Sequence, residues 1–209
     1  KNKGYGAAIN LALSRCVTKY AFISQIDVNY KKNFFKKFYD FSKRIKNFSI
    51  LIPNEKKKST QNIISENIDG EASTMLIDVK KIKKIRFDEN IFLYFEETDL
   101  FFRCKKKNYK VLDVNNFKIF KKRASSISYK NNKIENIMKW HYMWSMFYFY
   151  RKNYNYFFAL KKTYIYLFKD CIKLFIYLIL LDRYNFQIRF YRIYGLLTSI
   201  MGIKSFKRP

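Results

Sequence analysis

The chain has 209 residues, of which 49% are hydrophobic, and it carries a formal net charge of +27 at pH 7. This hydrophobic content is enough for a packed core, which excludes a chain that is disordered throughout. Five glycines and two prolines are too few for the many tight turns of a β-sandwich. The positive charge fits partners that carry phosphate groups, namely nucleic acid, anionic lipid or phosphorylated small molecules.

The cysteines and the histidine argue against a zinc site. Cys16, Cys104 and Cys171 are far apart, no Cys-x-x-Cys pair occurs, and His141 is the single histidine. An odd number of separate cysteines fits a reducing, cytoplasmic compartment. His141 stands among aromatic residues, where a packing role is the simplest interpretation.

The first thirty residues have the pattern of an open α/β sheet. A Gly4-Tyr5-Gly6 segment precedes a helical pattern over residues 7–13, and the apolar run 20–23 predicts a buried strand that ends at Asp27. In such sheets ligands bind beyond the carboxyl ends of the strands. We therefore expect the α/β class, with a site near Asp27.

The next hundred residues alternate between helical and strand patterns. Phe, Tyr and Lys recur at helical spacing over residues 33–48, and the polar residues 54–70 predict a loop. The remaining elements that we expect are strands at 49–53, 72–79 and 109–114, and helices at 79–85 and 98–107.

Residues 131–209 differ in composition and predict a helical extension rich in aromatic and basic residues. Its most apolar run, residues 174–181, is bounded by Lys173 and Asp182 and is far shorter than the ~20 residues that span a bilayer. A helix that lies in the interface of an anionic membrane is the expected arrangement. A helical pair that packs on the preceding domain is the alternative.

Two groups of carboxylates are candidates for chemistry. Asp27 follows a strand, where a carboxylate can hold a divalent cation that bridges two phosphates, although an exposed loop acid would look the same. Glu96, Glu97 and Asp99 gather at a helix start, where acids also stabilise the helix dipole. The aromatic residues before them place these carboxylates beside apolar surface, which favours the raised pKa of a general base.

The glycine segment adds a possible ligand contact. A Gly-x-Gly sequence before a helix can bring backbone N–H groups close to a phosphate or a sugar, although an ordinary loop has the same pattern.

Three segments occur in an order that resembles family 2 glycosyltransferases of the rhamnosyltransferase-like branch. Residues 2–10 (NKGYGAAIN) are similar to the family's N-x-G-[FY]-[GA]-x-[AG]-x-N segment. Residues 25–28 (QIDV) fall where the family has N-P-D-V, its version of the metal-binding DxD motif. Residues 87–103 (FDENIFLYFEETDLFFR) closely match F-D-E-x-F-F-[LM]-Y-x-E-[DE]-x-D-L-x-x-R.

The resemblance covers residues 1–130 and implies a partial GT-A domain. The family's first βαβ unit, with the base- and ribose-binding residues, is expected before Lys1. The enzyme would transfer a sugar, with inversion, from a nucleotide-diphosphate sugar to a lipid-linked or cell-surface glycan acceptor, as a cytoplasmic protein on the inner face of the membrane. No nucleic-acid partner is implied.

The resemblance also implies roles for single residues. Asp27 would bind Mg²⁺ or Mn²⁺, and Glu97 would deprotonate the acceptor hydroxyl. Glu96 would lie near the acceptor, and Asp99 would fix the loop through Arg103. The residues implied for donor binding are Asn2, Gly4, Gly6, Asn10 and Gln25.

Two departures leave alternatives open. Gln25 replaces the usual Asn or Asp, and the segment 119–126 lacks the histidine that often binds metal in the family. Either metal binding would then be weak, or Lys and Arg would partly replace the cation in countering phosphate charge. A degenerate member that binds glycan or a partner enzyme without catalysis is one alternative, and a nucleic-acid-binding protein driven by charge is the other.

Overall fold

The computed structural model describes residues 2–54, 63–67, 72–121 and 132–208. Contacts between residues divide the chain into two compact units, which interleave in the sequence. The sheet unit comprises Ile9–Phe87 and Glu97–Ile127, and the helical unit comprises Lys1–Ala8, Asp88–Glu96 and Ser128–Pro209. The boundary expected at residue 130 falls within 122–131, outside the described residues.

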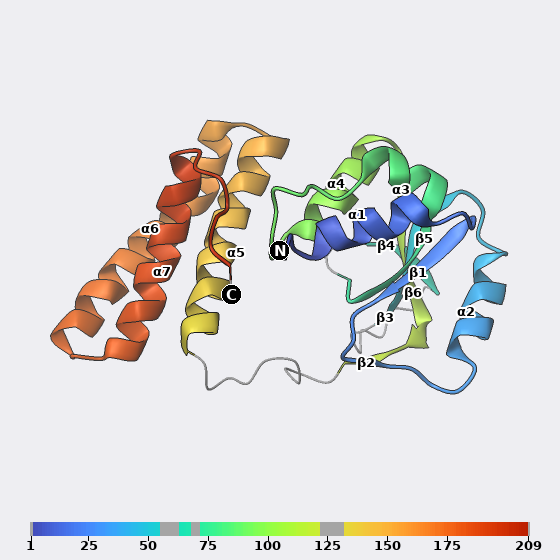
Figure 1. Ribbon diagram of the computed structural model, residues 1–209, viewed down its shortest axis with the longest axis horizontal. Helices are drawn as coiled ribbons and strands as arrows, with labels where there is room; N and C mark the ends of the chain where they lie inside the picture. Colours follow the sequence, from blue (N-terminus) through green and yellow to red (C-terminus); the bar gives the residue numbers. More distant parts are fainter. Residues whose placement is uncertain (1, 55–62, 68–71, 122–131, 209) are drawn as a thin grey trace. The chain divides into compact units, whose positions relative to one another are not determined.

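The sheet unit contains a five-stranded sheet with the order β1-β5-β3-β6-β4 (Figure 1). Strands β3 and β6 are parallel, and the other neighbouring pairs are antiparallel. A second sheet pairs β2 with β7 in antiparallel fashion. The strands are β1 (Tyr20–Ser24), β2 (Val28–Asn29), β3 (Phe48–Asn54), β4 (Ile64–Glu66), β5 (Thr74–Asp78), β6 (Lys110–Lys118) and β7 (Phe120–Lys121).

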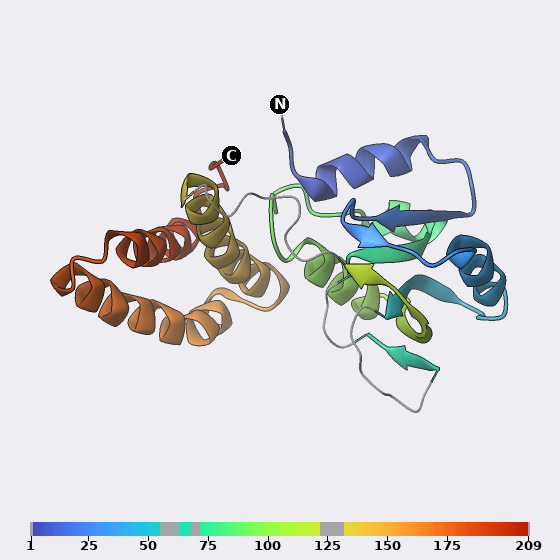
Figure 2. The same ribbon diagram turned by 90° about the horizontal axis from the view of Figure 1, so that it is seen from below.

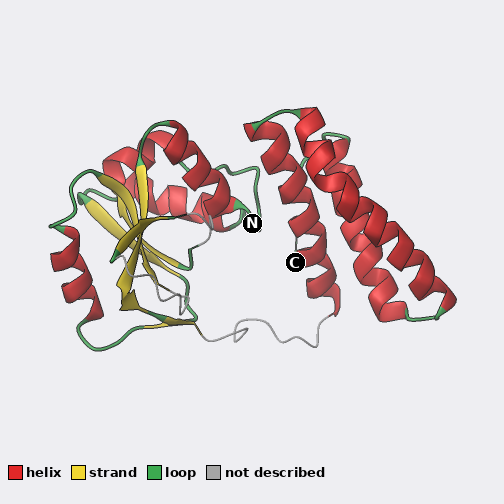
Figure 3. Cartoon of the chain, turned by 180° about the vertical axis from the view of Figure 1, so that it is seen from behind, coloured by secondary structure: helices red, strands yellow, loops and turns green. Residues whose placement is uncertain are grey.

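The helices of this part of the chain lie on both sides of the sheet, with α2 on one side and α1, α3 and α4 on the other (Figures 1 and 3). They are α1 (Tyr5–Arg15), α2 (Phe34–Ser42), α3 (Val79–Ile85) and α4 (Glu96–Lys106). The α/β class expected from the sequence is confirmed.

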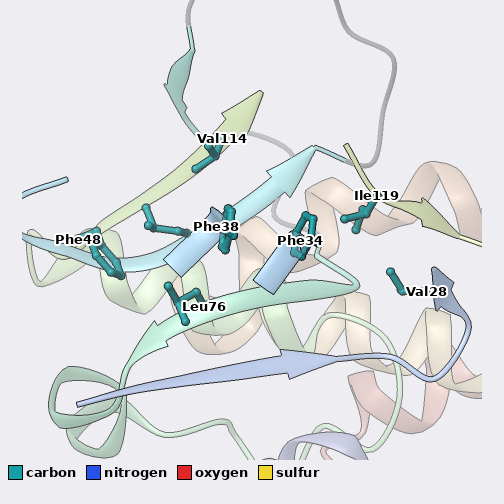
Figure 4. Packing of buried hydrophobic residues seen from close by; sticks show 8 residues of the cluster. Val28, Phe34, Phe38, Phe48, Leu76, Val114 and Ile119 are labelled. Atoms are coloured by element: carbon teal, nitrogen blue, oxygen red, sulfur yellow. The ribbon is translucent and has the colours of Figure 1, made fainter. Parts of the chain in front are cut away.

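One hydrophobic cluster fixes α2 on the sheet. Phe34 and Phe38 are one helical turn apart, so both point to the same side of α2, and both are buried. Phe38 is 1% exposed, and the two rings stack with centroids 5.4 Å apart. Figure 4 shows the cluster that they form with side chains of the strands and of the segment before β7, namely Val28, Phe48, Leu51, Leu76, Val114 and Ile119.

Two expected elements differ in the structure. The helix expected over residues 33–48 ends at Ser42, where tighter i→i+3 hydrogen bonds from the N–H groups of Arg44 and Ile45 replace the helical ones. The chain then turns through a left-handed Asn47 (φ 65°) before β3 begins at Phe48. The polar segment 54–70 was expected to be a loop, but its residues 64–66 form β4, which pairs with β6. Pairing with an existing strand stabilises β4 where its own sequence does not. The rest of that segment beyond Asn54, apart from residues 63–67, lies outside the described residues.

The helical unit contains α5 (Asn132–Asn153), α6 (Tyr156–Ile179) and α7 (Arg183–Ile200). Asn155 caps α6 and Asp182 caps α7, each by accepting a hydrogen bond from a backbone N–H three residues on. Figure 2 shows α6 and α7 side by side and joined by a short turn. Of the helices that the structure describes, none is both long and apolar enough to cross a membrane.

Close packing and buried charge join these three helices. A Cβ at Gly195 of α7 would lie 2.2 Å from the carbonyl oxygen of Trp140 in α5, so only glycine allows this approach. Asp170 of α6 is buried and lies 3.0 Å from Nη1 of Arg189 and 2.7 Å from Nε of Arg192 in α7. The core of this unit is formed by Met143, Met146, Phe147, Ala159 and Leu196.

Candidate functional site

Asp27 lies in the turn that leaves the end of β1. The Tyr30 hydroxyl contacts the Ser24 hydroxyl and lies 2.7 Å from Oγ1 of Thr74, the residue that pairs with Ser24 across β1 and β5. The Gln25 N–H donates to the Ser73 carbonyl at 2.9 Å. These hydrogen bonds fix both ends of the turn, and they leave Asp27 partly exposed at the carboxyl end of β1.

The segment in which the resemblance expects a histidine lies beside the strand that follows Asp27. In the second sheet, Val28 pairs with Lys121 and Asn29 pairs with Phe120. Residues 119–121 are Ile, Phe and Lys, and residues 122–126 lie outside the described residues. Strand pairing thus brings Phe120 and Lys121 near Asp27, and no histidine occurs anywhere in residues 119–126.

The acids at the start of α4 differ in burial. Asp99 is 0% exposed and Glu96 is 5% exposed, whereas Glu97 has intermediate exposure. Oδ2 of Asp99 lies 2.7 Å from both Nε and Nη2 of Arg103, which confirms the ion pair expected from their i,i+4 spacing. Glu97 is therefore the carboxylate of this cluster that is most open to a substrate.

Arg103 also holds the chain that leads to the acid cluster. Its Nη1 donates to the carbonyl oxygen of Ile85 at 2.8 Å, at the end of α3. Two residues further on, Phe87 is held by Asn10 of α1, which donates through Nδ2 to the Phe87 carbonyl at 3.0 Å and accepts from the Phe87 N–H at 2.9 Å. Because its amide binds backbone, Asn10 has a clear structural role in addition to the implied contact with a donor.

The residues directly before the acids have a strained backbone. Tyr94 and Phe95 have φ values of 65° and 70°, in the left-handed region that costs an L-residue roughly 1–2 kcal/mol. Within the helical unit, the Leu93 carbonyl accepts from Oγ of Ser145 at 2.9 Å, and the Phe95 ring contacts the ring of Tyr142. Consecutive non-glycine residues in this region mark a conformation that the surrounding packing imposes, as is common near active sites.

The glycine segment makes a close approach to this same loop. Gly4 has φ 93°, and a Cβ there would lie 2.7 Å from the Phe92 carbonyl oxygen, so glycine is required. The Gly4 N–H donates to Oδ1 of Asn2 at 2.9 Å. Gly6 is buried in α1.

Comparison with known proteins identifies the fold. No protein-family model matches the sequence. No curated protein matches it either. Among solved structures, the chain is similar to the mannosyltransferase PcManGT from Pyrobaculum calidifontis, which was solved in complex with GDP-Man and Mn²⁺. The TM-score is 0.53 at 9% sequence identity, over 95% of this chain and 67% of that chain. The chain has a glycosyltransferase fold.

In this glycosyltransferase fold, the predicted site residues are divided between the two units. Asn10, Gln25, Asp27, Glu97 and Asp99 belong to the sheet unit, and Asn2, Gly4, Gly6 and Glu96 belong to the helical unit. Throughout the residues that the structure describes, no three His, Cys, Asp or Glu side chains gather as a metal cage. A cation at Asp27 would need most of its ligands from elsewhere.

His141 has a packing role in the helical unit. It is fully buried, its Nε2 lies 2.9 Å from the Lys207 carbonyl oxygen, and its ring lies on Phe92. Burial lowers the pKa of His141 to about 4, against the effect of the backbone contact with Lys207. A neutral imidazole at physiological pH fits this interior position.

Sequence reasoning did not find the residues that shape the site. The hydroxyl groups of Ser24, Tyr30 and Thr74 hold the Asp27 turn, and the strain lies at Tyr94 and Phe95. The one available signal was the position of Ser24 at the strand end, directly before Gln25 and three residues before Asp27. Tyr30 and Thr74 are brought to it by strand pairing, which a single sequence does not reveal.

Proposed function

We propose that this chain is the catalytic part of an inverting glycosyltransferase of family 2, in the rhamnosyltransferase-like branch. It transfers a sugar from a nucleotide-diphosphate donor to a hydroxyl group of a glycan or lipid-linked acceptor. The observation that carries the proposal is the difference in burial among the acids of α4, within a glycosyltransferase fold. Two of them are buried, and Glu97 is open enough to meet a substrate.

Glu97 acts as the general base in this proposal. Its carboxylate accepts the proton of the acceptor hydroxyl while the hydroxyl oxygen attacks the anomeric carbon of the donor sugar. The bond from that carbon to the phosphate oxygen breaks, the nucleoside diphosphate leaves from the opposite face, and the configuration inverts. The ion pair between Asp99 and Arg103 and the strained Tyr94-Phe95 segment hold Glu97 in position.

The residues present fit a divalent cation that the donor helps to bind. Mg²⁺ in phosphate-transfer sites is typically held by one or two carboxylates together with substrate phosphates and water, and Asp27 supplies one carboxylate at a strand end. PcManGT was solved with Mn²⁺ and GDP-Man, which supports a cation of this kind. When bound, the cation would neutralise negative charge on the leaving diphosphate.

The test compares the proposed base with a glutamate outside the site. We expect Glu97→Gln to lower sugar transfer by roughly a hundredfold or more, since general-base catalysis contributes about that much, and to leave donor binding nearly unchanged. Glu66→Gln on β4 is the control, because the change is the same but this exposed side chain lies outside the acid cluster. Release of nucleoside diphosphate from GDP-Man and related donors, with Mn²⁺ present, gives turnover, and titration calorimetry gives donor binding. Near-normal turnover of Glu97→Gln would place the base elsewhere.

A non-catalytic member of the same fold is the second candidate. Gln25 at the turn and the segment 119–121 without histidine favour it, because both reduce the protein ligands available to a cation. Under this alternative, calorimetry detects no Mn²⁺-dependent binding of any nucleotide sugar, and Asp27→Ala changes nothing. Mn²⁺-dependent donor binding that Asp27→Ala removes would exclude it.

A further inference from the structure

Helix α6 carries an apolar surface, interrupted near its start by the exposed Lys161, that no described part of the chain covers. Its side chains are between 46% and 81% exposed, and they recur at intervals of three, four or seven residues, which places them on one side of a helix. We call this surface the α6 stripe. It consists of Phe157, which Lys161 separates from the rest, and of the uninterrupted run Tyr164, Phe168, Ile172, Phe175 and Ile179.

The opposite side of α6 is the one that packs in the helical unit. Ala159, Thr163 and Asp170 are buried there, and Asp170 is held by its two arginines from α7. The orientation of α6 is therefore fixed by its own unit, and the stripe cannot turn inward without breaking a buried ion pair. Exposed apolar surface of this extent is rare on a protein that has no partner for it.

The turn after α6 extends the apolar surface. Leu178, Leu180 and Leu181 are 55% to 87% exposed, and we call them, with Ile179, the leucine tip. Leu181 has φ 54°, and Asp182 directly after it caps α7 by accepting from the Asn185 N–H at 3.0 Å. The backbone of the tip is therefore ordered, and its exposed apolar side chains would gain free energy by leaving water.

Positive charge follows one side of the stripe. Lys162, Lys169 and Lys173 are exposed and are seven and four residues apart, so they form a row along α6. The acidic residues within α6, α7 and their turn are Asp170 and Asp182, and both are engaged, one with arginines and one as a helix cap. The row of lysines therefore has no acidic counterpart on its own helix.

The apolar stripe and the lysine row together favour an anionic membrane as the partner of this surface. An aromatic and aliphatic side with lysines along its edge matches the boundary between the acyl chains and the phosphates of an anionic bilayer. A second copy of the chain fits less well, because pairing two such faces would bring the lysine rows together. As α6 is not apolar enough to cross a membrane, it would lie along the surface.

We propose that the α6 stripe and the leucine tip insert into the headgroup–acyl boundary of an anionic membrane leaflet, with Lys162, Lys169 and Lys173 on the lipid phosphates. The inference names the segment that would hold the protein at a membrane. It does not rest on the proposed sugar transfer, because binding to vesicles is measured without any donor or acceptor.

Vesicle flotation tests the apolar part of the proposal. Wild-type protein floats with vesicles of phosphatidylglycerol and phosphatidylcholine in equal parts. Phe168→Glu and Phe175→Glu each lower the partition coefficient by about tenfold or more, since an inserted aromatic side chain is replaced by a charge. Leu11→Glu in α1 is the matched control, because Leu11 is 58% exposed, close to the 62% of Phe168, and lies outside the surface. It binds like the wild type.

The lysine row is tested by lipid composition. The triple variant Lys162→Gln, Lys169→Gln, Lys173→Gln lowers partitioning into the anionic vesicles by on the order of a hundredfold, and it leaves partitioning into pure phosphatidylcholine nearly unchanged. Equal losses in both kinds of vesicle would show that the lysines act through the fold and not on lipid phosphates.

A fluorophore on Cys171 reports insertion directly. Cys171 is exposed on α6, three residues after Phe168, whereas Cys104 is buried. With Cys16→Ser, an environment-sensitive label on Cys171 shifts its emission to the blue on addition of anionic vesicles. The control carries the label on Cys16 with Cys171→Ser and does not shift.

Several results would overturn the proposal. Wild-type protein that stays in the aqueous fractions, or Phe168→Glu protein that floats like Leu11→Glu, removes its basis. If sedimentation velocity shows that Phe168→Glu disperses a dimer while vesicle binding is unchanged, the surface binds a second copy instead. Thermal unfolding of each variant confirms that these exposed substitutions leave the fold intact.

Discussion

Replacement of Arg103 by alanine should destabilise the sheet unit far more than a surface substitution does. Asp99 is 0% exposed, and the Arg103 side chain is 20% exposed with three close contacts, two to Asp99 at 2.7 Å and one to the Ile85 carbonyl at 2.8 Å. Removal of the guanidinium leaves a buried carboxylate without its cation. We expect a loss of about 3–5 kcal/mol in the free energy of unfolding.

The assay is urea unfolding at neutral pH, with Lys43→Ala as the control. Lys43 and Asp40 are 3.2 Å apart at i,i+3 spacing, but both side chains are more than half exposed, so this substitution should cost at most about 0.5 kcal/mol. The double variant Asp99→Ala/Arg103→Ala should recover part of the loss, because it removes the buried carboxylate as well. A cost below about 1 kcal/mol for Arg103→Ala, or no recovery in the double variant, would refute the reasoning.

Three further outcomes are expected. Burial lowers the pKa of His141 to about 4, so between about pH 6.5 and pH 4 the unfolded chain binds more protons than the folded protein does. The free energy of unfolding should therefore decrease by on the order of 3 kcal/mol as the pH is lowered through this range. NMR titration of this single histidine checks the pKa, and urea unfolding of His141→Gln should be less sensitive to pH. Gly195→Ala should lower the melting temperature strongly or prevent folding, since its Cβ would lie 2.2 Å from the Trp140 carbonyl oxygen. Thermal unfolding followed by circular dichroism measures the melting temperature. An unchanged melting temperature would show that α5 and α7 can move apart at little cost in free energy. Tyr30→Phe removes the hydroxyl that bridges Ser24 and Thr74. We expect a loss of about 1 kcal/mol in the free energy of unfolding and weaker Mn²⁺-dependent donor binding in calorimetry. Tyr39→Phe is the control and should change neither, because Tyr39 lies on the exposed side of α2.

Much of the fold follows from local patterns that a single sequence contains. Strand β1 is predicted because an apolar run ends at polar residues, and residues 79–85 are expected to form a short basic turn or helix, where the structure has α3. The ion pair of Asp99 with Arg103 is also local, since i,i+4 spacing on a helix places the two side chains together. These features depend on neighbours within a few residues.

The remainder depends on contacts between distant residues. Strand β4 forms in a polar segment because β6 offers it backbone hydrogen bonds, and Asn10 binds the backbone of Phe87, which is 77 residues away. The left-handed conformation of Tyr94 and Phe95 is equally hidden, because aromatic residues seldom adopt positive φ and nothing in their sequence marks them. The order of motifs suggested the site, but the arrangement of its supports required the structure.

Gly4 is required in the structure for a reason different from the one that the sequence pattern suggests. Gly4 was singled out because glycine allows backbone to approach a phosphate or a sugar. In the structure its freedom is used for the approach to the Phe92 carbonyl, and its N–H is engaged by Asn2. The requirement for glycine is real, and a donor contact at this segment stays a prediction.

The anchoring of residues 88–96 on α5 has a consequence for chimeras between proteins of this fold. Lys152 and Tyr148 of α5 hold Asp88 at 2.7 Å and 3.0 Å, and Ser145 holds Leu93. A chimera that takes its C-terminal helices from a homologue would join them to a loop shaped for a different α5. A working chimera would therefore have to exchange two separate segments together, residues 88–96 and the C-terminal helices. The residues directly before the proposed base Glu97 would then come from the same protein as the helices.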